Sequence, residues 1–208
     1  MKRETDTTKR LLDVSLGIAG LIASAPVILA AGLAMRMSGD HGPVFFRAQR
    51  VGEGGRPITV LKLRTMRASS NGPAITGRGD PRVTRVGRVL RRFKIDELPQ
   101  LWCVVRGDMS LVGPRPEDPR YVDWSNPVHR QVFSARPGIT GLAQIRYRDE
   151  EALLQRPDRD SYYRSVILPA KLELDRDYLD HRSLKLDLRI LALTARSILI
   201  PPADGGRP

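Results

Sequence analysis

Two adjacent acids, Asp96 and Glu97, follow a run of basic residues near the middle of the 208-residue sequence. Further along the chain, prolines on both sides hold an arginine, Arg115, in a rigid loop. A carboxylate can attack a substrate or hold a metal ion, and guanidinium groups bind oxyanions through charge-assisted hydrogen bonds. We therefore expect Asp96 and Glu97 to be catalytic residues or metal ligands in a reaction on a phosphate group.

The same acids also have a purely structural interpretation. Residues 96 to 107 have the pattern of a short helix, with Pro99 in its first turn and Gly107 at its end. Acids at the start of a helix commonly cap it. A carboxylate in that place also faces the positive end of the helix dipole and stays ionised, as a nucleophile must. From this stretch alone, capping and catalysis both stay open.

A β-hairpin is predicted before the acids. Residues 43 to 52 and 58 to 64 have the composition and alternation of strands, and residues 52 to 57 are typical of a turn. The return strand presents Lys62 and Arg64, which are candidate phosphate-binding residues. The alternative is that both cations belong only to the solvated face of the hairpin.

Two further segments offer phosphate-binding or nucleotide-binding groups. Arginines recur at helical spacing from residue 82 to 92, and Arg91 belongs to this basic stripe. Residues 136 to 141 form a second rigid Gly/Pro loop, which offers Arg136 and Thr140 to a nucleotide. The stripe also fits anionic lipid headgroups, or a merely solvated helix face.

The N-terminal segment is predicted to place these acids and arginines at a membrane. Residues 14 to 35 carry no charged side chain and are long enough for a helix to cross a bilayer. Pro26 predicts a kink, which Ser24 can steady by bonding to a carbonyl that the proline frees. Because basic residues flank both ends, the positive-inside tendency favours a re-entrant helix over a spanning one. A cleaved signal peptide is disfavoured, since Pro26 would directly follow the cut.

Composition narrows the class of partner. The net charge is +12 and the pI about 10.6, which points to nucleic acid, anionic lipid or a phosphorylated substrate. Aromatic residues make up only 5%, which weakens the case for base stacking on nucleic acid. A single cysteine, Cys103, excludes an intramolecular disulfide. We expect a phosphorylated lipid or small molecule and no nucleic acid.

The predicted architecture is α+β. It is a mostly helical, membrane-associated domain with a small β-hairpin and a kinked, re-entrant N-terminal helix. We divide the chain into a membrane helix (residues 1 to 39), a catalytic domain (40 to 202) and a flexible tail (203 to 208). Within the catalytic domain, residues 142 to 148 are predicted as a strand and residues 158 to 181 as one amphipathic helix.

A series of motifs in a fixed order carries a family resemblance. The motifs are Lys9-Arg10-Leu11-Leu12-Asp13, the apolar run around Pro26, Lys62-Leu63-Arg64-Thr65-Met66, residues 80 to 87, Asp96-Glu97-Leu98-Pro99-Gln100, residues 107 to 116, and Arg136-Pro137-Gly138-Ile139-Thr140-Gly141. Together they resemble the bacterial sugar transferases, monotopic polyprenyl-phosphate phosphoglycosyl transferases that start glycan assembly. The short chain is similar to the small catalytic-core form of that family.

The resemblance implies an enzyme that transfers a sugar 1-phosphate from a UDP-sugar to polyprenyl (undecaprenyl) phosphate and releases UMP. Asp96 would form a covalent sugar-phosphate intermediate, and Glu97 would assist as metal ligand or as acid and base. Mg²⁺ would offset phosphate charge. Arg115 and Arg91 would bind phosphate, and the loop at residues 136 to 141 would help to hold the nucleotide.

The same resemblance implies a location at the bacterial inner (cytoplasmic) membrane. The catalytic domain would lie on the cytoplasmic face, bound to the lipid bilayer, and a homodimer is compatible with such anchoring. The sequence departs from the family at the bend, where Ala25 stands in place of a frequent serine, and at Cys103, where asparagine is common.

Two other hypotheses stay open at this point. The charge of +12 and the arginine stripe also fit a membrane-tethered nucleic-acid-binding protein. An inactive membrane scaffold with the same fold is the third possibility, and the intact acid pair and Arg115 argue against it.

Overall fold

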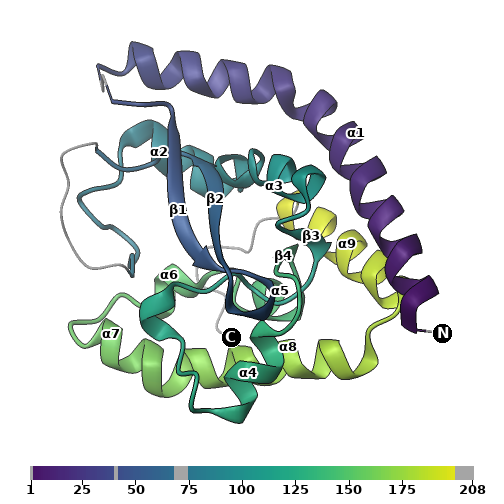
Figure 1. Ribbon diagram of the computed structural model, residues 1–208. Helices are drawn as coiled ribbons and strands as arrows, with labels where there is room; N and C mark the ends of the chain where they lie inside the picture. Colours follow the sequence, from purple (N-terminus) through teal and green to yellow (C-terminus); the bar gives the residue numbers. More distant parts are fainter. Residues whose placement is uncertain (1, 40–41, 68–74, 200–208) are drawn as a thin grey trace.

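A long, bent helix runs along one side of a smaller α+β domain in the computed structural model, which describes residues 2–39, 42–67 and 75–199 (Figure 1). This helix, α1 (Lys2–Met37), contains Pro26 in its interior. Its segment Thr7–Met37 has the length and the apolar composition needed to cross a membrane. The predicted mostly helical architecture is confirmed, whereas re-entry into a membrane stays a prediction. The predicted tail at residues 203 to 208 lies outside the described residues.

The bend of α1 follows from its proline. Because Pro26 has no amide hydrogen, the carbonyl of Ile22, one turn earlier, loses its helical donor. Figure 1 shows the helix changing direction near its middle. Ser24 is buried, and its hydroxyl donates to the carbonyl oxygen of Leu21 at 3.3 Å rather than to that of Ile22. Ser24 therefore bonds near the bend, but not to the carbonyl that the proline frees.

Helix α1 packs closely on α3 (Gln100–Arg106) because two glycines lie at the crossing. A Cβ atom on Gly20 would lie 3.1 Å from Cδ1 of Leu101, and one on Gly17 would lie 3.2 Å from Cγ2 of Val105. Both distances are below ordinary van der Waals contact, so glycine permits the approach of the two helices.

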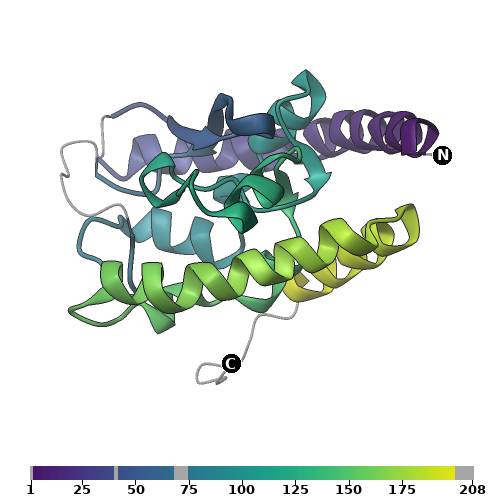
Figure 2. The same cartoon turned by 60° about the horizontal axis from the view of Figure 1, so that its bottom comes forward.

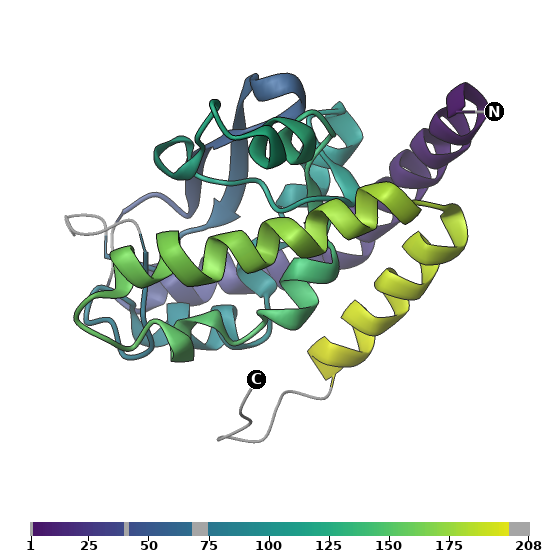
Figure 3. The ribbon, with the colours of Figure 1, turned by 90° about the horizontal axis from the view of Figure 1, so that it is seen from below.

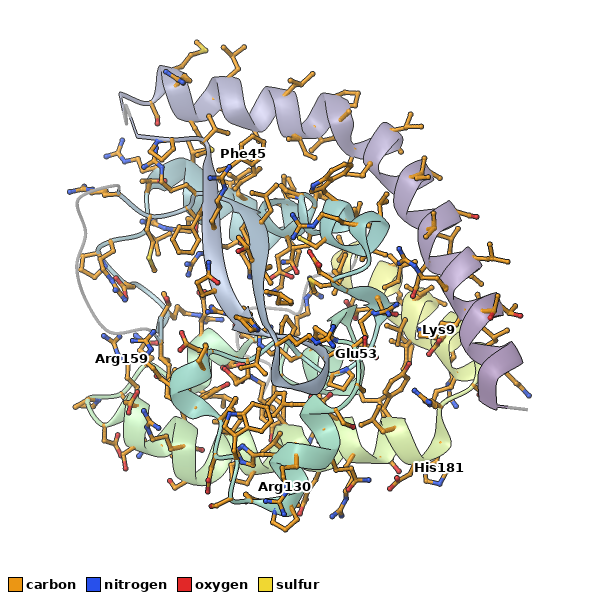
Figure 4. The ribbon with its side chains drawn as sticks, viewed as in Figure 1. Lys9, Phe45, Glu53, Arg130, Arg159 and His181 are labelled. Carbon is orange, nitrogen blue, oxygen red and sulfur yellow. The ribbon has the colours of Figure 1, made fainter. Side chains whose placement is uncertain are left out.

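Three charged residues at the start of α1 fix it to the domain. The guanidinium of Arg10 donates to the carbonyl oxygens of Val104 and Val105 at 2.7 and 2.9 Å, which satisfies the last turn of α3. Asp13, which is buried, accepts bonds from the Ser110 hydroxyl at 2.8 Å and the Leu111 amide at 3.0 Å. Lys9 points inward from the ribbon in Figure 4 and pairs with Asp187 at 2.7 Å.

The predicted hairpin is confirmed. Strands β1 (Phe45–Val51) and β2 (Pro57–Leu63) pair antiparallel, with Ala48 opposite Val60, and the short turn η1 (Glu53–Gly55) connects them. Both residues of that pair are buried in a core cluster that also contains Val104 of α3. The hairpin therefore forms one wall of the domain, against which the acid-bearing segment packs.

A second sheet was not predicted. Strands β3 (Ser110–Val112) and β4 (Gly138–Thr140) pair in parallel, so the two Gly/Pro loops after residues 107 and 136 lie side by side. Gly138 allows this pairing, since a Cβ atom there would lie 2.1 Å from the amide nitrogen of Gly113. The predicted strand at 142 to 148 is wrong: helix α5 (Leu142–Arg146) forms there, because Leu142 and Ile145 pack on the same core at helical spacing.

The remaining helices complete the domain, and those of residues 159 to 181 lie on the far side from α1. The predicted helix at 158 to 181 consists of α7 (Arg159–Tyr162), a π-helical turn at Tyr163–Ile167 and α8 (Leu168–His181). Figure 2 and Figure 3 show α8 running across the face opposite α1, with α9 turning back from its end. The other elements are α2 (Arg85–Arg92), η2 (Ile95–Glu97), η3 (Pro119–Tyr121), α4 (Pro127–Phe133), α6 (Glu150–Leu153) and α9 (Leu184–Leu199).

The close crossing of α1 and α3 predicts that Gly20→Leu destabilises the fold. The added side chain overlaps Leu101, and overpacking of this kind costs roughly 1–3 kcal/mol. Ala19→Leu is the matched control, because Ala19 is exposed on the opposite side of the same turn. Thermal unfolding of the detergent-solubilised protein measures the difference. Equal melting temperatures for the two variants would contradict the described crossing.

Candidate active site

Asp96 and Glu97 lie in the short 3₁₀ turn η2, not in the helix that follows it. Lys94, directly before this turn, has a left-handed backbone with φ 56°, and is the one non-glycine residue with positive φ in the described ranges. Helix α3 begins at Gln100 with Pro99 at its N-cap and no side-chain capping bond. The acids therefore do not cap α3, and the capping interpretation does not hold.

The two acids have different surroundings. Asp96 is only 8% exposed, and its Oδ1 atom has no hydrogen-bond partner among the described residues. Glu97 accepts a bond from the ammonium group of Lys62 on β2 at 3.0 Å. An orphaned buried carboxylate oxygen is costly in a folded protein, so a functional partner outside the chain is the natural explanation.

Burial and neighbouring charges also shift the pKa values of the two acids in opposite directions. Burial opposes the ionisation of Glu97, yet the positive charges of Lys62 and Lys94 outweigh it and lower its pKa to about 2. Burial, and secondly the negative charge of Glu97, raise the pKa of Asp96. The cations of Lys62, Lys94 and Arg91 act against that rise. Glu97 is thus a fixed negative charge, whereas Asp96 is the more basic acid of the pair, because burial and the charge of Glu97 outweigh the neighbouring cations.

A large cleft of about 1410 Å³ contains the acid pair. Of the residues that the sequence nominated, Lys62, Arg64, Arg91, Arg115 and Thr140 line it together with Asp96 and Glu97. These residues come from β2, α2, η2, β4 and the loop after β3, so only the folded chain brings them together.

Arg115 is held in place by its backbone. Pro114 and Pro116 fix the loop on either side, and the amide of Arg115 donates to Oδ2 of Asp175 on α8 at 3.3 Å. Burial lowers the pKa of Arg115, but the carboxylates of Glu150 and Glu97 outweigh it, so the pKa is raised. The guanidinium is therefore permanently charged and interacts electrostatically with Glu97.

A buried polar network supports this part of the cleft. The hydroxyl of Tyr163 donates to Oε2 of Glu117 at 2.5 Å, and the ammonium of Lys171 lies 3.4 Å from that hydroxyl and 2.6 Å from Oε2 of Glu150. The sequence analysis missed these residues. The available signal was Lys171 itself, because it occupies an apolar position of the helical pattern in α8, where a charge needs a buried partner.

Acids pair with two further cations of the cleft lining, Arg91 and Arg78. Glu151 pairs with Arg91 at 2.7 Å, and Arg91 also donates to the hydroxyl of Thr65 at 2.8 Å. The neighbouring Asp149 pairs with Arg78 at 2.7 Å. A phosphate that binds Arg91 must therefore displace Glu151, which is half exposed on its short helix.

Two nominated cations have structural partners. The guanidinium of Arg64 is buried and donates to the carbonyl oxygens of Pro43 and Met66 at 2.5 and 3.1 Å. Arg136 pairs with Glu53 at 3.3 Å, at the end of the hairpin seen in Figure 4, and is absent from the described lining of the cleft. Thr140 shares a hydrogen bond of 2.7 Å with Thr194 of α9.

Asp175 makes stability depend on pH. Burial raises its pKa to about 7, above the ordinary value of about 3.9. A carboxyl whose pKa is higher in the folded than in the unfolded protein stabilises the fold at pH values below its unfolded pKa. This contribution to the free energy of unfolding is lost as pH rises from about 4 to about 7. Asp175→Asn keeps an acceptor for the Arg115 amide and removes the titration. We expect the difference in the free energy of unfolding, variant minus parent, to be roughly 1–3 kcal/mol more positive at pH 8 than at pH 4.

Denaturant unfolding at a series of pH values tests this expectation. Asp180→Asn, a change at an exposed acid of the same helix, serves as the control. If the free energies of unfolding of the parent and of Asp175→Asn changed with pH in parallel, the carboxyl of Asp175 would have an ordinary pKa.

The sequence of the chain is similar to those of known proteins. Residues 4–201 match the family model described as bacterial sugar transferase. The chain is 42% identical to a UDP-glucose:undecaprenyl-phosphate glucose-1-phosphate transferase of Caulobacter vibrioides, over 93% of this chain and 70% of that protein. It is 37% identical to a UDP-N-acetylgalactosamine-undecaprenyl-phosphate N-acetylgalactosaminephosphotransferase of Aeromonas hydrophila, over 92% of this chain and 43% of the relative.

A third relative carries the same printed activity as the first. The chain is 37% identical to the UDP-glucose:undecaprenyl-phosphate glucose-1-phosphate transferase of Escherichia coli, over 89% of this chain and 39% of that protein. The chain therefore spans less than half the length of two of these three relatives.

Proposed function

Because the chain belongs to the bacterial sugar transferase family, we propose that it transfers a sugar 1-phosphate from a UDP-sugar to polyprenyl phosphate. UMP is the leaving product, and the lipid-linked sugar starts the assembly of a glycan. One observation carries the proposal: Asp96 presents a buried oxygen without a partner among the described residues, within a cleft lined by cations.

The proposed reaction has two displacement steps. An oxygen of the Asp96 carboxylate attacks the β-phosphorus of the UDP-sugar, the bond from that phosphorus to the bridging oxygen breaks, and UMP leaves. A phosphate oxygen of the lipid then attacks the same phosphorus. The bond to Asp96 breaks, which restores the carboxylate and gives polyprenyl diphosphate sugar. A covalent step of this kind divides one difficult transfer into two easier ones.

The surroundings of the two acids favour Asp96 as the nucleophile. Glu97 directs an oxygen at Lys62, and its low pKa of about 2 makes it a poor proton donor and a weak nucleophile. Its permanent charge suits a metal ligand or an electrostatic partner instead. Asp96 keeps a buried oxygen without a partner among the described residues, and its raised pKa makes its carboxylate the more basic nucleophile of the two.

The two acids also fit Mg²⁺, which often binds proteins through one or two carboxylates and takes its other ligands from water and substrate phosphates. Among the described residues no cluster of three or more acidic, histidine or cysteine ligands exists, so a cage made only of protein is not available. Asp96 and Glu97 would hold the ion, which would offset charge on the diphosphate. Arg115, and Arg91 once Glu151 is displaced, would bind phosphate oxygens directly.

Helix α1 supports a membrane location for this chemistry. Its apolar side chains are largely exposed, among them Leu11, Ile22, Leu29, Leu33 and Met37, as a lipid-facing helix requires. The bend at Pro26 and the basic flanks support re-entry, with the catalytic domain on the cytoplasmic face of the inner membrane. A soluble nucleotide and a lipid phosphate can then meet at one surface.

Release of UMP from UDP-sugars in the presence of Mg²⁺ and undecaprenyl phosphate tests the proposed function. We expect turnover with at least one UDP-sugar, and a loss of at least roughly a thousandfold in Asp96→Asn, because the amide is a far weaker nucleophile. Asp158→Asn is the control, since Asp158 is exposed and pairs with Arg156 outside the cleft. UMP release by Asp96→Asn at the parent rate would exclude Asp96 as the nucleophile.

The two arginine loops are expected to differ in importance. Arg115→Met removes a charge within the cleft, and we expect kcat/KM for the UDP-sugar to fall roughly ten- to a hundredfold, the cost of a lost charged hydrogen bond. Arg136→Met changes a side chain that pairs with Glu53 at the hairpin end, so its effect should be smaller. Initial rates over a range of UDP-sugar concentrations measure both. An equal loss in the two variants would place Arg136 at the substrate.

A further inference from the structure

Part of the cleft lining is aliphatic, and the phosphate chemistry leaves it unused. We call this region the aliphatic arm. Its lining contains Leu98 and Leu101 near α3, Ile139 of β4, Ile145 of α5 and Ile198 of α9. Leu101, Ile139 and Ile145 belong to one hydrophobic cluster, and the hydrogen bond between Thr140 and Thr194 joins β4 to α9 there. The aliphatic arm is thus a single place in the fold.

Another part of the cleft lining, which we call the charged end, has a different character. Arg50 pairs with Asp118 at 3.3 Å, Arg120 pairs with the same carboxylate at 2.8 Å, and the Tyr121 ring packs against Tyr163. Charges and aromatic rings of this kind suit a nucleotide. The five residues that define the aliphatic arm include no aromatic ring and no charge, so they suit a hydrocarbon.

The aliphatic arm connects the acid pair to the apolar exterior. Leu98 directly follows Glu97, so the arm begins beside the catalytic carboxylates. On the same two helices, Trp102 of α3 is 51% exposed and Leu193 of α9 is 39% exposed. These side chains, like the exposed face of α1, are apolar groups outside the described lining of the cleft.

We propose that the aliphatic arm binds the isoprene units of polyprenyl phosphate nearest to its phosphate group. This assignment rests on the proposed function and deepens it, because it separates the two substrates. The UDP-sugar occupies the charged end, the lipid chain occupies the aliphatic arm, and Asp96 lies where the two ends meet. The acceptor phosphate then attacks the phosphorus from the side that UMP has left, opposite to the bond with Asp96 that breaks.

Ile198→Ser tests the assignment with little risk to the fold. Ile198 lines the arm but belongs to none of the described core clusters, in contrast to Ile139 and Ile145. The matched control is Leu188→Ser on the same helix, because Leu188 is 52% exposed and lies outside the described lining. Each protein is assayed in two ways: exchange of labelled UMP into the UDP-sugar without lipid, and full transfer with either undecaprenyl phosphate or geranyl phosphate.

The expected result is a selective effect on the acceptor. Loss of the isoleucine contact raises KM for undecaprenyl phosphate roughly tenfold in Ile198→Ser, while UMP exchange proceeds as in the parent. The same rise appears with geranyl phosphate, whose short chain reaches only the aliphatic arm. Leu188→Ser retains the parent KM for both lipids.

Three results would overturn the assignment. Slower UMP exchange with an unchanged lipid KM would place the nucleotide in the arm. An effect on undecaprenyl phosphate that is absent with geranyl phosphate would indicate contact with bulk lipid instead, and an unchanged KM for both lipids would leave the arm without a ligand. If the parent protein exchanges no UMP with any UDP-sugar, the proposed function itself is wrong, and the lipid assignment is lost with it.

Discussion

The ion pair between Lys62 and Glu97 decides how two neighbouring acids differ. It fixes Glu97 as a permanent charge at 3.0 Å from the ammonium group and leaves Asp96 with a buried oxygen that has no partner among the described residues. Burial alone would neutralise both acids. The cations of Lys62 and Lys94 keep Glu97 ionised, whereas the pKa of Asp96 stays raised. The catalytic assignment therefore depends on β2 and η2 lying side by side.

The rest of the fold holds these two elements together. The left-handed backbone at Lys94 turns η2 away from α2, and α3 buries its own residues against the hairpin. Helix α1 is fixed to the same α3 by Arg10 and by the glycines at the crossing. The acid pair is thus connected to the apolar helix through one short helix.

Local signals in the sequence predicted much of this structure. The alternation of β1 and β2 indicated the hairpin, and Gly107, with φ 100°, ends α3 where a stop was expected. The family and its enzyme class, a phosphoglycosyl transferase, are confirmed by the comparisons. The sheet of β3 and β4 was not predicted, because strands of three residues are too short to show an alternating pattern. Residues 142 to 148 were mistaken for a strand, because the helical packing of Leu142 and Ile145 depends on distant core residues.

The site was predicted less completely, because the spacing of residues in the sequence does not reveal which groups their side chains bond to. Lys62 and Arg64 are two residues apart on one strand, yet the first pairs with Glu97 and the second donates to backbone carbonyls. The network of Glu117, Tyr163 and Lys171 joins segments that only the tertiary fold brings together.

The most direct test of the central claim is to trap the intermediate on Asp96. The protein is incubated with Mg²⁺ and its UDP-sugar in the absence of lipid, quenched, and analysed by intact-mass and peptide mass spectrometry. The proposed mechanism predicts a mass gain of one sugar-phosphate group on the peptide that contains Asp96, and its loss when polyprenyl phosphate is added before the quench. A full turnover of UDP-sugar in the presence of lipid, with no adduct or with an adduct on another residue, would contradict it.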